Sequence, residues 1–142
     1  MKRLLLAAVA GLLLAAESRA LPFTFVTDPA DGAVSGTPGS RIGWGYSITN
    51  PDPALWLWVT ELTAYPFTNG ALLSVFDYPI LAPGTSVSSW FDPVLGTGLL
   101  GFQWDDIAGV QSYNAGLFGL SGIFWTDDPF GGGPLQRILL LR

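Results

Sequence analysis

Two tryptophans, Trp56 and Trp58, are the residues whose spacing most directly suggests a binding site. Residues two apart in a β-strand share a face, so both rings would lie on one side of the strand, opposite a face of leucine and valine. A pair of aromatic rings of this kind can stack on sugar rings. The alternative is structural: if this strand pairs with Arg41–Thr49, the rings would cover the bare backbone of Gly43 and Gly45. We favour this second interpretation.

Two pairs of aspartates, Asp105-Asp106 and Asp127-Asp128, follow tryptophans at the ends of apolar stretches. Carboxylate oxygens are ligands that calcium prefers, so each pair is a candidate calcium site. Neighbouring residues of an extended chain point to different sides, however, and neither stretch has the spacing of a known calcium loop. We therefore interpret both pairs as solvated, turn-forming residues and leave calcium binding open.

The chain contains no cysteine and no histidine. Thiolate and imidazole catalysis, disulfides and the usual zinc, copper and haem sites are thereby excluded. Hydrolysis of a glycosidic bond by two carboxylates is the enzymatic option that remains, with Glu61, Asp77 and Asp92 among the candidates. Because no nucleophile elbow, phosphate loop or metal-ligand pattern accompanies them, we expect no enzyme activity and no cofactor.

Residues 1–20 have the order of features of a secretion signal, with two cations, a 13-residue apolar run and the ending Ser18-Arg19-Ala20. Thirteen residues are too few to span a bilayer, which needs about 20. We expect a signal helix over residues 1–20, cleavage before Leu21, secretion, no membrane span in the mature chain, and one domain over residues 21–142.

The mature chain is acidic and contains no lysine. Three arginines face ten carboxylates, which gives a net charge of −7 once the signal is removed. Such a chain cannot neutralise phosphates, so nucleic acids and anionic membrane surfaces are poor partners.

Short segments with a two-residue alternation predict an all-β fold. The predicted strands are Phe23–Thr27, Arg41–Thr49, Leu55–Leu62, Leu73–Tyr78, Ser86–Phe91, Leu99–Trp104, Leu117–Thr126 and Leu135–Leu141. About seven or eight short strands without helical spacing between them favour an antiparallel two-sheet sandwich of immunoglobulin-like type. The prolines at positions 51 and 53 favour a hairpin between the second and third strands.

Turns and the core follow from the same alternation. Pro-Gly dipeptides at residues 38–39 and 83–84 predict type II turns, because Pro fixes a negative φ and Gly accepts a positive one. We expect eight large side chains to lie in the core. They are Ile42, Trp44, Tyr46, Ile48, Leu57, Val59, Phe102 and Phe124.

Three stretches, VSGTPGSRIGWGYSITN (34–50), ILAPGTS (80–86) and FWTDDPFGGG (124–133), occur in an order that resembles secreted bacterial proteins of the PEP-CTERM sorting-signal type. The resemblance implies a β-sandwich exported to the cell surface or biofilm matrix, with no catalytic residues to carry over. The sequence departs from this pattern after its last predicted strand, where the sorting tail of Pro-Glu-Pro, apolar anchor and basic residues is lacking.

We therefore expect a non-catalytic, secreted structural or adhesive module of the bacterial cell surface or extracellular matrix. Its expected partners are extracellular polysaccharide or other matrix proteins. The alternative is a carbohydrate-binding module that uses Trp56 and Trp58.

Overall fold

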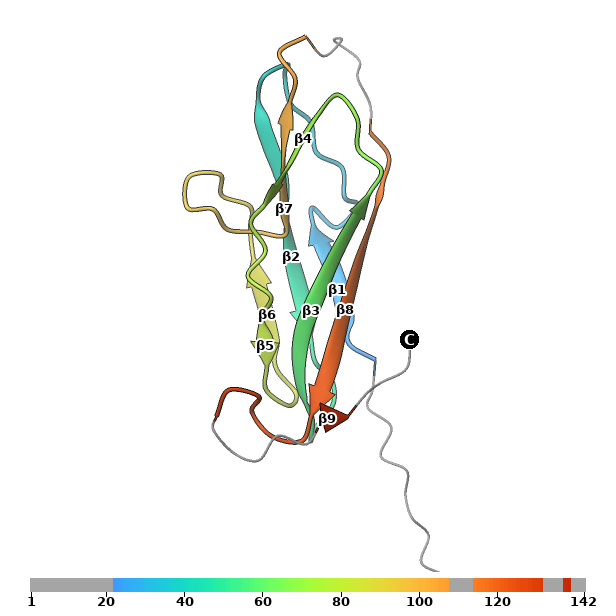
Figure 1. The fold of residues 1–142 in the computed structure, drawn as a ribbon, viewed down its shortest axis with the longest axis vertical. Coiled ribbons are helices and arrows are strands. Elements are labelled where there is room, and N and C mark those ends of the chain that lie inside the picture. The colour runs from blue at the N-terminus through green and yellow to red at the C-terminus, as the bar shows by residue number, and fades with distance from the viewer. Residues whose placement is uncertain (1–21, 108–113, 132–136, 139–142) are drawn as a thin grey trace, which may run out of the picture.

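The computed structural model of the 142-residue chain describes residues 22–107, 114–131 and 137–138. All regular structure in this part of the chain is β-strand, arranged as two antiparallel sheets that face each other (Figure 1). The predicted all-β, two-sheet sandwich is confirmed. The signal helix expected over residues 1–20 lies outside the described residues. Within the described ranges, no helix has the length and apolar character needed to cross a membrane.

The strands of each sheet come from distant parts of the chain. The first sheet contains β1 (Thr24–Asp28), β2 (Arg41–Thr49), β7 (Leu100–Trp104) and β4 (Gly70–Ser74), with β6 (Ser86–Ser89) also paired to β2. The second sheet has the order β5 (Ile80–Leu81), β3 (Trp56–Tyr65), β8 (Leu117–Trp125) and β9 (Arg137–Ile138).

Strand β2 holds the first sheet together. One of its edges pairs with β1 over residues 45–49, and the other pairs with β6 over residues 46–49 and with β7 over residues 41–44. Strands β6 and β7 therefore follow each other along one edge of β2, and residues 90–98 between them leave the sheet as a projecting loop (Figure 1).

The core lies between the sheets and is rich in aromatic side chains. Seven of the eight predicted core residues are buried, and Ile42 is partly buried against the same cluster. The Trp44 ring meets Phe118 edge to face at 5.1 Å, and its Nε1 donates a 2.6 Å hydrogen bond to the carbonyl of Gly32. Aromatic pairs that join the two sheets thus fix their separation.

Tyr46 places a polar atom at the edge of this core. Its hydroxyl donates a 2.6 Å hydrogen bond to Oδ1 of Asp77. Burial raises the pKa of Tyr46 far above its usual range, and the hydrogen bond and negative charge of Asp77 raise it further. The phenol is therefore held in its protonated, donating form.

The expected hairpin between β2 and β3 is wrong, because the two strands belong to different sheets. The segment 50–55 crosses from one sheet to the other and buries Asn50 completely. The Asn50 side-chain amide donates to the carbonyls of Leu55 (2.8 Å) and Ala82 (3.1 Å). The first bond closes the crossover on itself, and the second ties it to the chain that follows β5.

Most other strand predictions agree with the structure to within a few residues. Strand β4 begins and ends earlier than the predicted Leu73–Tyr78, and the short β5 was not expected. Both Pro-Gly turns are confirmed: Gly39 and Gly84 have φ of 74° and 67°, and each turn closes with a backbone hydrogen bond. The last predicted strand is described only at Arg137–Ile138.

Candidate binding surfaces

Trp56 and Trp58 lie on the outer face of the second sheet. Leu57 between them is fully buried in the core, so the alternating tryptophans point away from it. The register places Trp56 beside Trp125 and Trp58 beside Ile123 of β8. Both predicted site residues are half-buried, and the structure does place them together on one face.

These tryptophans do not cover Gly43 and Gly45, so that interpretation is wrong. The two glycines lie in β2 of the other sheet. A Cβ added at Gly43 would collide with the ring of Phe91, and one added at Gly45 would approach the carbonyl of Ser89 at 2.5 Å. The chain leaving β6 covers both glycines, because it returns to the same edge of β2.

The outer tryptophan face is partly overlaid by a loop that follows β8. The Phe130 ring meets the Trp58 ring edge to face at 5.4 Å, yet Phe130 remains 69 % exposed. Oδ1 of Asp128 accepts a 2.9 Å hydrogen bond from the backbone of Phe130 and holds the turn. A ring from the loop and a ring from the strand thus border one accessible corner.

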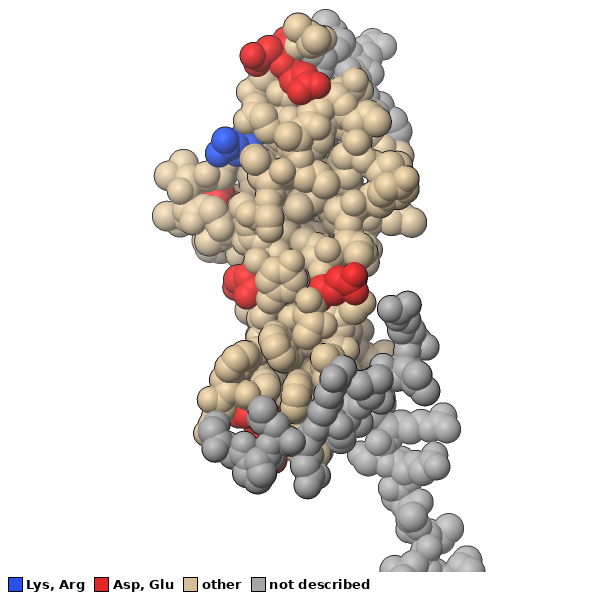
Figure 2. Space-filling view, in the orientation of Figure 1, with Lys and Arg blue, Asp and Glu red and all other residues tan. Residues whose placement is uncertain are grey.

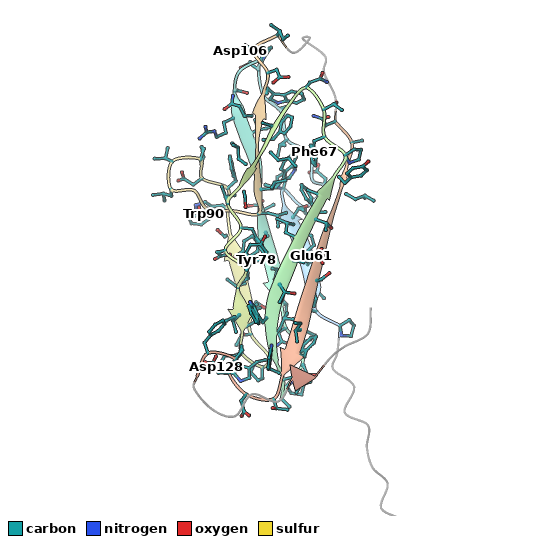
Figure 3. The ribbon with its side chains drawn as sticks, viewed as in Figure 1. Glu61, Phe67, Tyr78, Trp90, Asp106 and Asp128 are labelled. Atoms are coloured by element: carbon teal, nitrogen blue, oxygen red, sulfur yellow. The ribbon has the colours of Figure 1, made fainter. Side chains whose placement is uncertain are left out.

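The two aspartate pairs lie far apart. Asp106 and Asp128 are at opposite ends of the molecule in Figure 3. Asp105 contributes its backbone to bonds with Gly39 and Asn69, and Asp128 caps its own turn. Among the described residues, no three or more acidic side chains gather in a way that could hold a metal ion.

An aromatic cleft of about 690 Å³ opens between the sheets, at the free edge of β1. Its walls come from β1 and the residues after it, from β2 and β7, and from the start of β8. The lining includes Phe25, Val26, Trp44, Phe67, Leu117 and Phe118. Asp31 is the only ionisable side chain among the lining residues, which also include the polar Thr27 and Asn114. The cleft therefore offers aromatic and aliphatic walls with polar groups among them.

A second apolar feature, the projecting loop 90–98, stands on the other side of β2. Trp90 and Leu95 are each 73 % exposed and Val94 is 90 % exposed. Asp92 holds the loop, because its Oδ1 accepts hydrogen bonds from the backbone of Val94 (2.7 Å) and Leu95 (2.9 Å). Figure 3 shows Trp90 where this loop leaves the sandwich.

Neither the cleft nor the loop was predicted from the sequence. The cleft depends on the meeting of β1 with the start of β8, about 90 positions apart, and no local pattern shows this. The loop has a local signal, because Asp92-Pro93 interrupts an apolar stretch, but the predicted strand Ser86–Phe91 extends into the loop by two residues.

Comparison with known proteins adds no family assignment: no family model, no curated protein and no solved structure matches this chain.

Proposed function

We propose that this chain is a non-catalytic, secreted structural or adhesive module of the bacterial cell surface or extracellular matrix. The observation that carries the proposal is the loop 90–98, on which apolar side chains are held out from the sandwich by hydrogen bonds to Asp92. Large exposed apolar groups on an ordered loop are typical of surfaces that contact other molecules.

The scarcity of chemistry-bearing side chains supports the same proposal. The cleft is lined by one carboxylate, Asp31, whereas glycosidic hydrolysis by carboxylates uses two that face each other. The face shown in Figure 2 is mostly uncharged, with a few acidic side chains at its upper end and near its middle. The signal-like residues 1–20 and the resemblance to PEP-CTERM-type proteins support secretion.

The proposal is tested by expressing the full chain in a bacterium and separating cytoplasm, medium and washed matrix. We expect protein that begins at Leu21 in the matrix fraction, and reduced retention for Val94→Asp combined with Leu95→Asp. Ile107→Asp is the matched control, since Ile107 is 93 % exposed and lies outside both the loop and the cleft lining. Cytoplasmic protein that still carries Met1, or equal retention of loop variant and control, would contradict the proposal.

The second candidate function is carbohydrate binding through the corner formed by Trp58 and Phe130. The specific observation in its favour is that the half-buried Trp58 ring contacts the ring of Phe130, which is 69 % exposed. Polysaccharide pull-down should then be lost in Trp58→Ala and Phe130→Ala but kept in Tyr65→Ala, an exposed aromatic elsewhere. Equal retention by all three variants would remove this candidate.

A further inference from the structure

We propose that the loop 90–98 of one copy inserts into the aromatic cleft of a second copy, so that the chain assembles head to tail. This inference rests on the proposed function, since it names the partner of the adhesive surface as another copy of the same chain. Four observations support it: the order of the loop, the lining of the cleft, the position of the few charges, and the placement of loop and cleft on opposite edges of β2.

The loop is fixed in shape before it meets a partner. Its neck is closed by backbone hydrogen bonds between Asp92 and Thr97, of 3.0 Å and 3.2 Å. Phe91 packs over Gly43 at the base of the loop, which anchors the neck to β2. Because these bonds already order the backbone, insertion loses little conformational entropy.

The cleft is large enough to receive side chains from the tip of the loop. Its volume of 690 Å³ can accommodate several aliphatic side chains, and six of its eighteen lining residues are aromatic. Two cleft residues are themselves exposed apolar groups, Val26 and Leu117, and both would lose contact with water on insertion. Burial of apolar area on both partners is the main driving force for such contacts.

Arg41 lies outside the loop 90–98, which itself carries Asp92. Arg41 is the only Lys or Arg among residues 22–107 and 114–131. It lies three positions before Trp44, whose partner Leu100 follows the loop, and the single blue side chain in Figure 2 stands beside that loop. The cleft contains Asp31. When the loop enters the cleft of another copy, Arg41 offsets the repulsion between Asp92 of the loop and Asp31 of the cleft.

The loop and the cleft lie on opposite edges of one strand. Strands β1 and β6 both pair with β2 over residues 46–49, and a strand has two edges, so they must flank it. The cleft opens at β1 and the loop leaves after β6. One copy can therefore fill a cleft with its loop while its own cleft accepts another loop, which generates an open chain of copies unless the rotation closes it.

The test is sedimentation of the exported protein over a concentration range of about 1 μM to 1 mM, where weak self-association becomes visible. We expect the average mass to rise continuously with concentration. Val94→Asp combined with Leu95→Asp, and separately Leu117→Asp in the cleft, should each weaken association at least about tenfold. The control Ile107→Asp should associate like the parent, and circular dichroism should show the same fold for all variants.

Mixing distinguishes this geometry from other contacts. The loop variant keeps an intact cleft and the Leu117→Asp variant keeps an intact loop, so an equimolar mixture should form one-to-one dimers that grow no further. Symmetric dimers of the parent, failure of the two variants to pair, or a parent that stays monomeric at every concentration would each overturn the inference. Loop-dependent matrix retention by a monomeric protein would overturn the inference while leaving the proposed function intact.

Discussion

Two connections in this molecule use the same four-residue turn in opposite surroundings. Asp52–Leu55 and Asp92–Leu95 both read Asp-Pro-x-Leu. In each, Oδ1 of the aspartate accepts hydrogen bonds from the backbone two and three residues later, at 2.7 to 2.9 Å. Leu55 of the first turn is 5 % exposed, whereas Leu95 of the second is 73 % exposed.

The difference shows that the four residues themselves determine the shape of the turn, whereas the surrounding fold determines whether its leucine is buried. Asp and Pro supply the bend in both places, because Pro presets φ and the carboxylate satisfies the freed N–H groups. The first turn lies on a crossover between sheets, so its leucine enters the core. The second returns to the same edge of β2 and leaves its leucine in solvent. Nothing in the turn itself requires Leu95 to be apolar.

The largest expected effect is the difference in unfolding free energy between Leu55→Ala and Leu95→Ala. Leu55→Ala should lower the free energy of unfolding by about 2–5 kcal/mol, because it removes a buried side chain and leaves a cavity. Leu95→Ala should change it by less than about 0.5 kcal/mol, since its side chain is exposed. Urea unfolding of both variants measures the difference. Equal losses would show that the two turns do not differ in burial as described.

Asn50→Ala should come next. The fully buried Asn50 amide donates to the carbonyls of Leu55 and Ala82, and the bond to Leu55 is itself buried. We expect a loss of about 2 kcal/mol, the usual cost of leaving buried polar groups unsatisfied. Thermal unfolding measures this, with Asn114→Ala as the control, because Asn114 is partly buried and its side-chain bond to the Thr68 carbonyl is exposed. A loss no larger than that of the control would contradict a structural role for the crossover.

The two turn aspartates give a smaller pair of effects. Asp52→Ala should lower the free energy of unfolding by about 1–3 kcal/mol, because its acceptor serves a buried backbone N–H. Asp92→Ala should cost about 1 kcal/mol, as at an exposed helix cap, since water can replace the carboxylate. Urea unfolding of both variants should show the larger loss of unfolding free energy for Asp52→Ala. The reverse order would show that exposure does not set the cost.

The smallest expected effect is that of Val94→Asp with Leu95→Asp. Both side chains point into solvent and the Asp92 bonds use backbone groups, so the free energy of unfolding should change by less than about 0.5 kcal/mol. Differential scanning calorimetry at low protein concentration checks this. A large loss would mean that these side chains stabilise the sandwich itself.

Sequence patterns predicted what is local and missed what depends on distant contacts. The alternation in Arg41–Thr49 gave the bounds of β2 and its buried face, and the Pro-Gly dipeptides gave two turns. The predicted pairing of β2 with β3 was wrong. The buried Asn50 that follows β2 binds a carbonyl more than thirty positions later, and no local pattern predicts such a contact. The placement of Trp56 and Trp58 on one face was predicted, but the contact of Trp58 with Phe130 was not, because Phe130 lies about 70 positions later in the chain.

The interrupted edge of β2 also defines a natural insertion point. Ser89 pairs with Tyr46, and extending the register of β7 would place Leu99 opposite Gly45, so the two strands continue each other without a shift when residues 90–98 are set aside. A segment at this site can lengthen, shorten or be exchanged while every other strand keeps its partner. Exchanging it removes Phe91, whose ring packs over Gly43. The scaffold and the loop can thus diversify independently, and the same position is a graft site for foreign peptides.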